Sequence, residues 1–145
     1  MLCNAAIVRA VVESLRNHDV PNLVVDPVMF SKSGHRLLDP EAEQAVIEQL
    51  LPLCAVVTPN LPEASRLAGF DVEDAETMIE AAEAILQLGP SAVIVKGGHL
   101  PDVASDLLYD GDTFTELPEV RIQTKNTHGT GCSFASALAT ELARG

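Results

Sequence analysis

The chain has 145 residues, with 9 Lys and Arg against 21 Asp and Glu, for a formal net charge of -12. This length suits one domain or part of one. So acidic a chain is a poor partner for nucleic acid or for an anionic membrane, because both attract clustered Lys and Arg. We therefore expect a small-molecule ligand and neither of those partners, while composition leaves homo-oligomerisation open.

Cysteine usage and hydropathy indicate the compartment. Cys3, Cys54 and Cys132 form no C-x-x-C pair, and this odd number at wide spacing fits a reducing compartment without disulfides. Cys54 lies in an apolar run, which predicts a buried thiol. No apolar run approaches the roughly 20 residues that a bilayer-spanning helix needs, and the N-terminus lacks the basic start of a signal peptide. The cytoplasm is the expected location.

The first half of the chain alternates helical and strand patterns. Apolar residues at helical spacing predict a helix over residues 4–17, with Asn4 as a candidate cap. "NLVVDPV" predicts a short strand that stops at Asp26. Asp39 followed by a proline and acidic residues predicts the start of a helix over residues 39–51. "CAVVTPN" predicts the next strand, ending before Asn60.

The second half continues the alternation. We expect a short helix over residues 61–69, a longer one over 72–89, and a buried strand in "SAVIVKGG". Two strands should flank the turn at Asp110 and Gly111, and "EVRIQTK" predicts a further strand before a helix from Gly131 onward. Short apolar strands alternating with helices indicate an α/β fold with a mostly parallel sheet covered on both faces. Ligands of such sheets bind outside the carboxyl ends of the strands.

Polar residues stand at those strand ends, each with two explanations. Asp26 after "VV" is either a turn carboxylate or part of a site. Asn60 and Glu63 bracket a helix start, which suits a capping box or, with their hard oxygens, a hydrated Mg²⁺. Lys96 before two glycines suits a phosphate contact or a lysine at the sheet rim.

The stretch "THGTGC" is the most specific of these motifs. Gly129 and Gly131 leave backbone amides uncovered at a helix start, where the unpaired N–H groups and the helix dipole favour an anion. Cys132 in the first turn would have its thiolate favoured by the same field. The alternative is a tight turn that only packs the helix. A Walker A motif is absent from the sequence.

Taken in order, "VVDPVMFSKSGHRLLD", "TPNLPEA", "VIVKGGHL" and "TKNTHGTGCSFASALA" resemble the hydroxymethylpyrimidine/phosphomethylpyrimidine kinases of thiamine biosynthesis, members of the ribokinase-like superfamily. The resemblance implies a three-layer α/β/α fold, incomplete here. It also implies ATP-dependent phosphorylation of 4-amino-5-hydroxymethyl-2-methylpyrimidine and of its monophosphate. The cysteine in "GTGC" favours this branch, since many ribokinase-like enzymes have aspartate there.

The resemblance also implies residue roles and cofactors, namely ATP and Mg²⁺. Cys132 matches the catalytic base, and the anion hole matches Gly129, Thr130 and Gly131. Lys96 would contact ATP phosphate, while Asn60 and Glu63 would organise the metal shell on the ATP. Asp26 would lie near the metal, partly through water, and Val28 near the pyrimidine.

In the family, the segment matching Met1 and Leu2 lies well inside the chain, and further helices follow the part matching "ELARG". We therefore expect residues 1–145 to be the central and C-terminal portion of a kinase domain. The alternatives are a pyridoxine-type kinase, or an inactive fragment that only binds nucleotide or partner chains.

Overall fold

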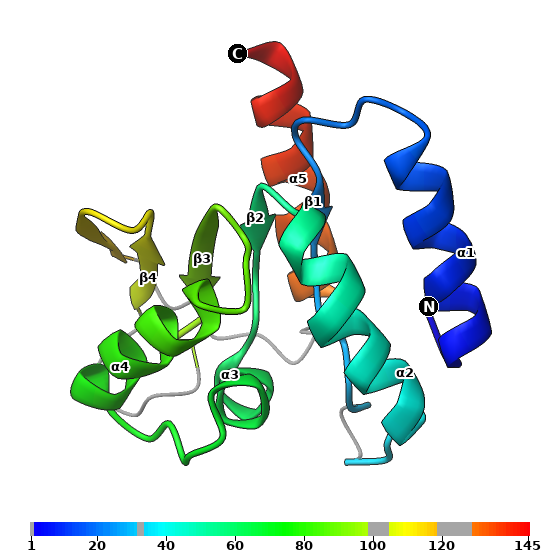
Figure 1. Ribbon diagram of the computed structural model, residues 1–145. Coiled ribbons are helices and arrows are strands. Elements are labelled where there is room, and N and C mark those ends of the chain that lie inside the picture. Colours follow the sequence, from blue (N-terminus) through cyan, green and yellow to red (C-terminus); the bar gives the residue numbers. More distant parts are fainter. Residues whose placement is uncertain (1, 32–33, 99–104, 119–128) are drawn as a thin grey trace.

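The computed structural model describes residues 2–31, 34–98, 105–118 and 129–145. The elements follow in the order α1 (Ala5–Arg16), β1 (Val24–Val25), α2 (Pro40–Ala45), η1 (Val46–Leu50), η2 (Leu51–Leu53), β2 (Val56–Val57), α3 (Leu61–Ala68), α4 (Ala75–Leu86), β3 (Ala92–Val95), β4 (Ser105–Tyr109), β5 (Phe114–Pro118) and α5 (Thr130–Arg144) (Figure 1). The expected strand over residues 119–125 lies outside the described residues.

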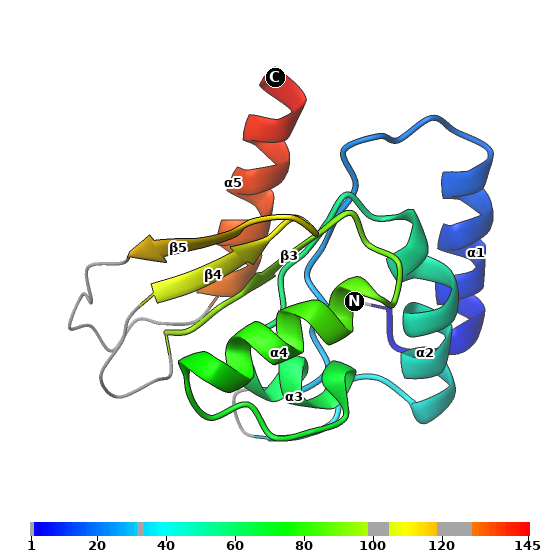
Figure 2. The same cartoon turned by 60° about the vertical axis from the view of Figure 1, so that its left-hand side comes forward.

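The described strands form one sheet in the order β1-β2-β3-β4-β5. β1, β2 and β3 run parallel, with Val25 opposite Val57 and Val57 opposite Val93. β4 and β5 add an antiparallel hairpin to β3. Figure 2 shows α5 on one face of this sheet and α3 and α4 on the other. The predicted three-layer α/β/α arrangement is therefore confirmed.

The hydrophobic core lies on the α3–α4 face of the sheet. Val57, Val93 and Val95 are fully buried there, together with Ala81 and Ile85 of α4. The thiol of Cys54 is buried as predicted, and burial raises its pKa to about 12. By contrast, no residue of α5 is buried, and this helix meets the sheet mainly at β1.

Most predicted helix starts are correct, but the helix predicted over residues 72–89 is shorter, Ala75–Leu86, and a second helix ends earlier than predicted. The Asn4 side chain caps α1 by accepting from the Ile7 amide at 3.0 Å. Asp39 occupies the N-cap of α2 as expected, although its side chain makes no capping hydrogen bond. The helix predicted to reach residue 51 stays α-helical only to Ala45. It then passes through a π turn and a 3-10 turn at Pro52, because proline offers no N–H for an α-helical bond.

The hairpin turn forms at the predicted residues. Gly111 has a φ of 95°, and Asp110 accepts from the amides of Asp112 and Thr113. The rings of Tyr109 and Phe114 stack across the hairpin with centroids 4.1 Å apart. The turn residues and this aromatic pair together fix the register of β4 and β5. In the part of the chain that the structure describes, none of the helices has both the length and the apolar character to span a bilayer.

Candidate functional site

Two charged side chains from different strands meet at the carboxyl end of the sheet. Asp26 follows β1 and Lys96 follows β3, and the Lys96 Nζ lies 2.9 Å from Asp26 Oδ1. Their side chains are only 13 % and 15 % exposed, respectively. An ion pair this sheltered from water is stronger than a surface pair, because solvent screens it less. The structure therefore brings these predicted residues together, and Lys96 is more than a lysine at the sheet rim.

The N-terminus of α5 lies directly against this ion pair. A Cβ built on Gly131 would be 3.1 Å from Lys96 Nζ, and 3.7 Å and 4.0 Å from the two carboxylate oxygens of Asp26. Gly129 precedes the helix as its N-cap with a left-handed φ of 80°, a conformation that favours glycine. The N-terminal end of a helix dipole is positive, so the start of α5 brings partial positive charge to the ion pair.

Asn60 and Glu63 form a complete capping box at the start of α3. Asn60 Oδ1 accepts from the Glu63 amide at 2.9 Å, and Glu63 Oε2 accepts from the Asn60 amide at 2.9 Å. Asn60 is also bridged to Lys96 in the parallel ladder. The capping explanation therefore holds for both residues, and the cap places them at the same sheet edge as the ion pair.

Glu63 is a buried acid in a mixed electrostatic environment. Its exposed fraction is 2 %, and this burial raises the pKa of the carboxyl above its usual value. The Asn60 amide and the charge of Lys96 lower that pKa, whereas the Asp26 carboxylate raises it. A backbone hydrogen bond from Met29, in the segment after β1, lowers it further. The same carboxyl thus connects α3 with the chain that leaves β1.

Two further predicted residues lie around this centre. Cys132 is an exposed free thiol in the first turn of α5, one residue beyond Gly131. Val28 is half-buried after β1, and its amide donates to the Asp26 carbonyl at 2.9 Å. The described residues contain no cluster of His, Cys, Asp and Glu side chains arranged to hold a metal ion by themselves. A metal here would need waters or ligand phosphates to complete its shell.

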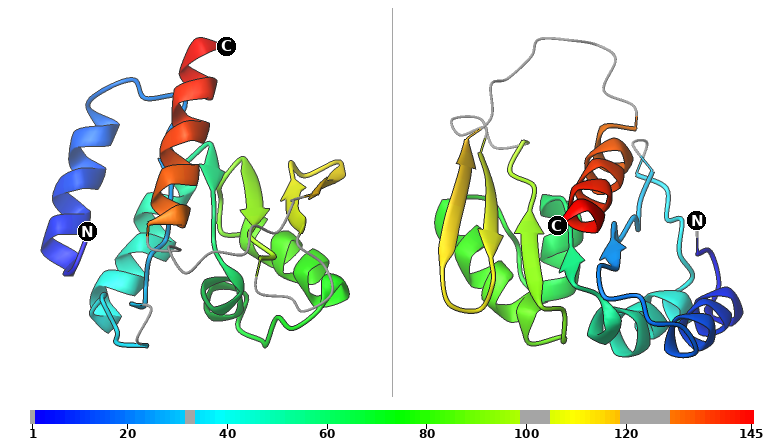
Figure 3. Two further views of the ribbon diagram at one scale, coloured as in Figure 1. Left: turned by 180° about the vertical axis from the view of Figure 1, so that it is seen from behind. Right: turned by 90° about the horizontal axis from the view of Figure 1, so that it is seen from above.

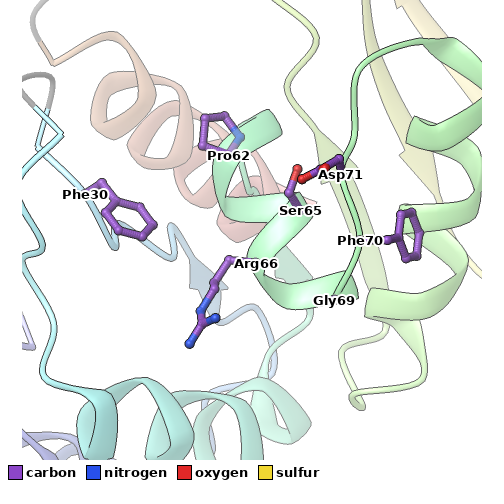
Figure 4. Close-up of a pocket in the computed structure, with 7 residues that line it drawn as sticks. All are labelled: Phe30, Pro62, Ser65, Arg66, Gly69, Phe70 and Asp71. Carbon is purple, nitrogen blue, oxygen red and sulfur yellow. The ribbon is translucent and has the colours of Figure 1, made fainter.

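One of the described grooves lies elsewhere. About 510 Å³ in volume, it lies along α3, and Figure 4 shows Phe30 on one side of that helix and Phe70 on the other. The guanidinium of Arg66 is already paired with Glu43, which also holds Arg36. None of the residues predicted for the site lines this groove. The strand-end cluster has the specific charges, so it is the better candidate site.

One residue of this region, Thr58, was not among those predicted from the sequence. It is fully buried directly after β2, and its hydroxyl has no hydrogen-bond partner in the described structure. Its signal in the sequence was a polar residue within the apolar run "CAVVTPN".

Known proteins similar to this chain identify its family. A family model described as phosphomethylpyrimidine kinase matches residues 1–145. A hydroxymethylpyrimidine/phosphomethylpyrimidine kinase of Rhizobium meliloti is 48% identical; the match covers 100% of this chain and 55% of that protein.

Two solved structures are similar over the whole chain. Phosphomethylpyrimidine kinase from Clostridium difficile has a TM-score of 0.86 at 39% identity, with 58% of its chain covered. Pyridoxal kinase from Staphylococcus aureus in complex with AMP-PCP has a TM-score of 0.90 at 39% identity, with 53% covered. The chain thus spans little more than half the length of these proteins. On the full-length match of its family model, the chain belongs to the phosphomethylpyrimidine kinase family.

Proposed function

We propose that this chain carries the phosphoryl-transfer centre of an ATP-dependent kinase. Its substrates are 4-amino-5-hydroxymethyl-2-methylpyrimidine and the monophosphate of that pyrimidine. One observation carries the proposal most directly: the start of α5 lies against a sheltered Lys96–Asp26 ion pair at the carboxyl end of the sheet. Phosphoryl transfer depends on positioning and on neutralising charge, and this arrangement supplies both.

Positive groups around the start of α5 suit the transferring phosphoryl group. The backbone amides of Gly129, Thr130 and Gly131 form the anion hole, where the helix dipole adds to their partial charges. The Lys96 ammonium, close to Gly131, neutralises phosphate charge from the sheet side. These donors are fixed by the backbone before ligand binds, so little reorganisation is needed as charge develops.

Cys132 is the base in this proposal. The substrate hydroxyl oxygen forms a new bond to the γ-phosphorus while the bond from that phosphorus to the bridging oxygen breaks, leaving ADP. The hydroxyl proton passes to the thiolate of Cys132. Cys132 lies in the first turn of α5, beside the proposed anion hole, and its thiol is exposed to an incoming substrate.

The donor set suits Mg²⁺ bound largely through water. Asp26 and Glu63 provide carboxylates around Lys96, while Asn60 Oδ1 and Glu63 Oε2 are already used in the capping box. These residues would therefore hold the ion through its waters, which Mg²⁺ gives up reluctantly. When bound, the metal neutralises charge on the phosphate oxygens. Val28, half-buried beside Asp26, is assigned to the pyrimidine pocket.

A pyridoxal-type substrate is the second candidate, because the pyridoxal kinase of Staphylococcus aureus is as similar in fold as the pyrimidine kinase of Clostridium difficile. The test is a coupled assay of ADP release with Mg²⁺, ATP and either the hydroxymethylpyrimidine or pyridoxal. The proposal expects ADP release that depends on the pyrimidine. Release only with pyridoxal would favour the second candidate, and a folded chain that turns over neither would refute the kinase assignment for these residues alone.

A further inference from the structure

Asp106 is a buried carboxylate outside the strand-end cluster described above. It lies on β4 and is 5 % exposed. Its Oδ1 accepts from the backbone amide of Gly97 at 2.9 Å, so a side chain of β4 holds the backbone that follows β3. Burying a carboxylate costs free energy, and a hydrogen bond to a charged acceptor is stronger than one between neutral groups. The bond therefore fixes Gly97 more firmly than an ordinary backbone hydrogen bond would.

This contact lies where the regular pairing of β3 with β4 stops. Val95 and Leu107 are the last pair at this end of the ladder. A Cβ built on Gly97 would be 2.0 Å from the carbonyl oxygen of Ser105, so the two strands approach this closely because residue 97 is a glycine. At this point the Asp106 carboxylate receives the Gly97 amide and ties the end of β3 to β4.

The backbone of Lys96 is held from the other neighbouring strand. Its amide donates to the Pro59 carbonyl at 2.8 Å, and Lys96 is bridged to Asn60 in parallel. Figure 3 shows β3 between β2 and the hairpin of β4 and β5. Two consecutive amides, those of Lys96 and Gly97, are thus fixed by the chain segments on opposite sides of β3.

Lys96 and Asp106 lie on the same face of the sheet. Val95 belongs to the hydrophobic core on the α3–α4 face, and Leu107 packs against that core. Side chains alternate between the faces of a sheet, so the residues next to these two, Lys96 and Asp106, lie on the face where α5 begins. Asp106 is therefore beside the strand end from which the Lys96 ammonium reaches Asp26.

The position of the Lys96 ammonium depends on where the backbone of this strand end is held. The ammonium lies 2.9 Å from Asp26 Oδ1 and 3.1 Å from a Cβ built on Gly131. A misplacement of about 1 Å in a reacting site can cost about a hundredfold in rate. Without the Asp106 carboxylate, the buried Gly97 amide would lose this acceptor, and the end of β3 would have to shift to find another.

We propose that Asp106 is a positioning residue: it accepts from the Gly97 amide and thereby holds the Lys96 ammonium at the start of α5. The inference deepens the proposed function and rests on it. Asp106 acts through Gly97 and Lys96. Its loss should change both the ion pair with Asp26 and the affinity for ATP, whereas a carboxylate that only stabilises the hairpin would affect neither.

Variants of Asp106 in the 145-residue chain test this role. Asp106→Leu keeps the branching of the aspartate side chain but accepts no hydrogen bond, whereas Asp106→Asn keeps an acceptor oxygen. Asp110→Leu is the matched control, because Asp110 lies in the same hairpin and accepts from the amides of Asp112 and Thr113. Asp106→Ala replaces the leucine variant if the latter does not fold.

A double-mutant cycle with Asp26→Asn measures, without ligand, whether Asp106 acts on the ion pair. In urea unfolding, Asp106→Leu and Asp26→Asn together should lose less stability than the sum of their separate losses, because a displaced Lys96 has already left Asp26. Asp110→Leu and Asp26→Asn together should lose the full sum. Additive losses for Asp106→Leu and Asp26→Asn would overturn the proposal.

Calorimetric titration with ATP and Mg²⁺ gives the second readout. Asp106→Leu should bind ATP about tenfold more weakly than wild type, the loss expected for one hydrogen bond between Lys96 and a phosphate. Asp106→Asn should stay within about threefold of wild type, and Asp110→Leu should bind normally. An Asp106→Leu variant that binds like wild type, or an Asp106→Asn variant as weak as Asp106→Leu, would also overturn the proposal. Wild-type chain that binds no ATP would refute the proposed function, while the cycle would still decide whether Asp106 positions Lys96.

Discussion

A side chain at Gly131 would crowd the ammonium of Lys96. A Cβ on Gly131 would lie 3.1 Å from the Lys96 ammonium, a spacing that few real Cβ atoms show. The backbone at the start of α5 and the ammonium at the end of β3 thus approach each other closely because residue 131 is a glycine. A phosphate held between them would contact donors from both elements.

Substituting Gly131→Ala should therefore separate ligand binding from folding. Alanine favours the helix by about 1 kcal/mol over glycine, so the variant should fold at least as stably as wild type. Its methyl group would displace Lys96 and narrow the phosphate space, and we expect ATP affinity to fall about tenfold or more. Calorimetric titration measures the affinity, and urea unfolding measures the stability.

Gly98→Ala is the matched control for that substitution. A Cβ at Gly98 would meet nothing within 4 Å, although this residue follows the same strand end as Lys96. ATP affinity of this variant should stay within about twofold of wild type. Equal losses in the two variants would show that crowding at Gly131 is not the cause.

The ion pair itself should contribute to stability as well as to binding. Asp26→Asn leaves the sheltered Lys96 ammonium without its carboxylate, and we expect the free energy of unfolding to fall by about 2–4 kcal/mol. Glu141→Gln breaks an ion pair whose side chains are 68 % and 71 % exposed, and it should cost less than about 0.5 kcal/mol. Urea unfolding at neutral pH compares the two. A loss for Asp26→Asn no larger than that for Glu141→Gln would contradict the importance of the Lys96 contact.

Local signals in the sequence predicted where most of the described helices start. They predicted less well where α2 ends. Asn4 and Asn60 cap their helices as their residue types suggest, because a capping bond spans only three positions. The early end of α2 comes ahead of Pro52, which offers no N–H to the helix, but the apolar pattern continues through it. Periodicity alone therefore extended that helix too far.

The site could be predicted only in part, for a related reason. The sequence places Asp26 and Lys96 at strand ends, but their contact joins residues 70 positions apart and depends on strand register. The position of Thr58, which follows Val57 where that residue pairs with Val25, depends on the same register. For Asn60 and Glu63 the sequence left a capping box and a metal shell as alternatives, and the structure shows the capping box.

Glu63 should make stability fall as pH rises. Burial raises its pKa in the folded state above the ordinary value of 4.5, so between these two values the folded protein binds more protons than the unfolded chain. The stabilising contribution is complete below pH 4.5 and is lost as pH rises through the folded-state pKa. Urea unfolding of wild type and Glu63→Gln from pH 4 to 8 should show wild type losing stability relative to the variant. Parallel curves would contradict the raised pKa, and Glu116→Gln, at an exposed position of β5, should run parallel to wild type.

Cys132→Ala tests the chemical step apart from binding. The thiol is exposed, so its removal leaves no cavity in the core, and alanine suits the helix. If Cys132 takes the proton of the substrate hydroxyl, turnover should fall by about a hundredfold or more while ATP affinity stays within about twofold. The measurements are the coupled ADP assay with hydroxymethylpyrimidine and calorimetric titration with ATP. Ser136→Ala, one turn further along α5 on an exposed position, is the control and should leave both quantities unchanged. Equal turnover in Cys132→Ala and wild type would remove the thiol from the mechanism and leave the anion hole and Lys96 as the groups that act on the phosphate.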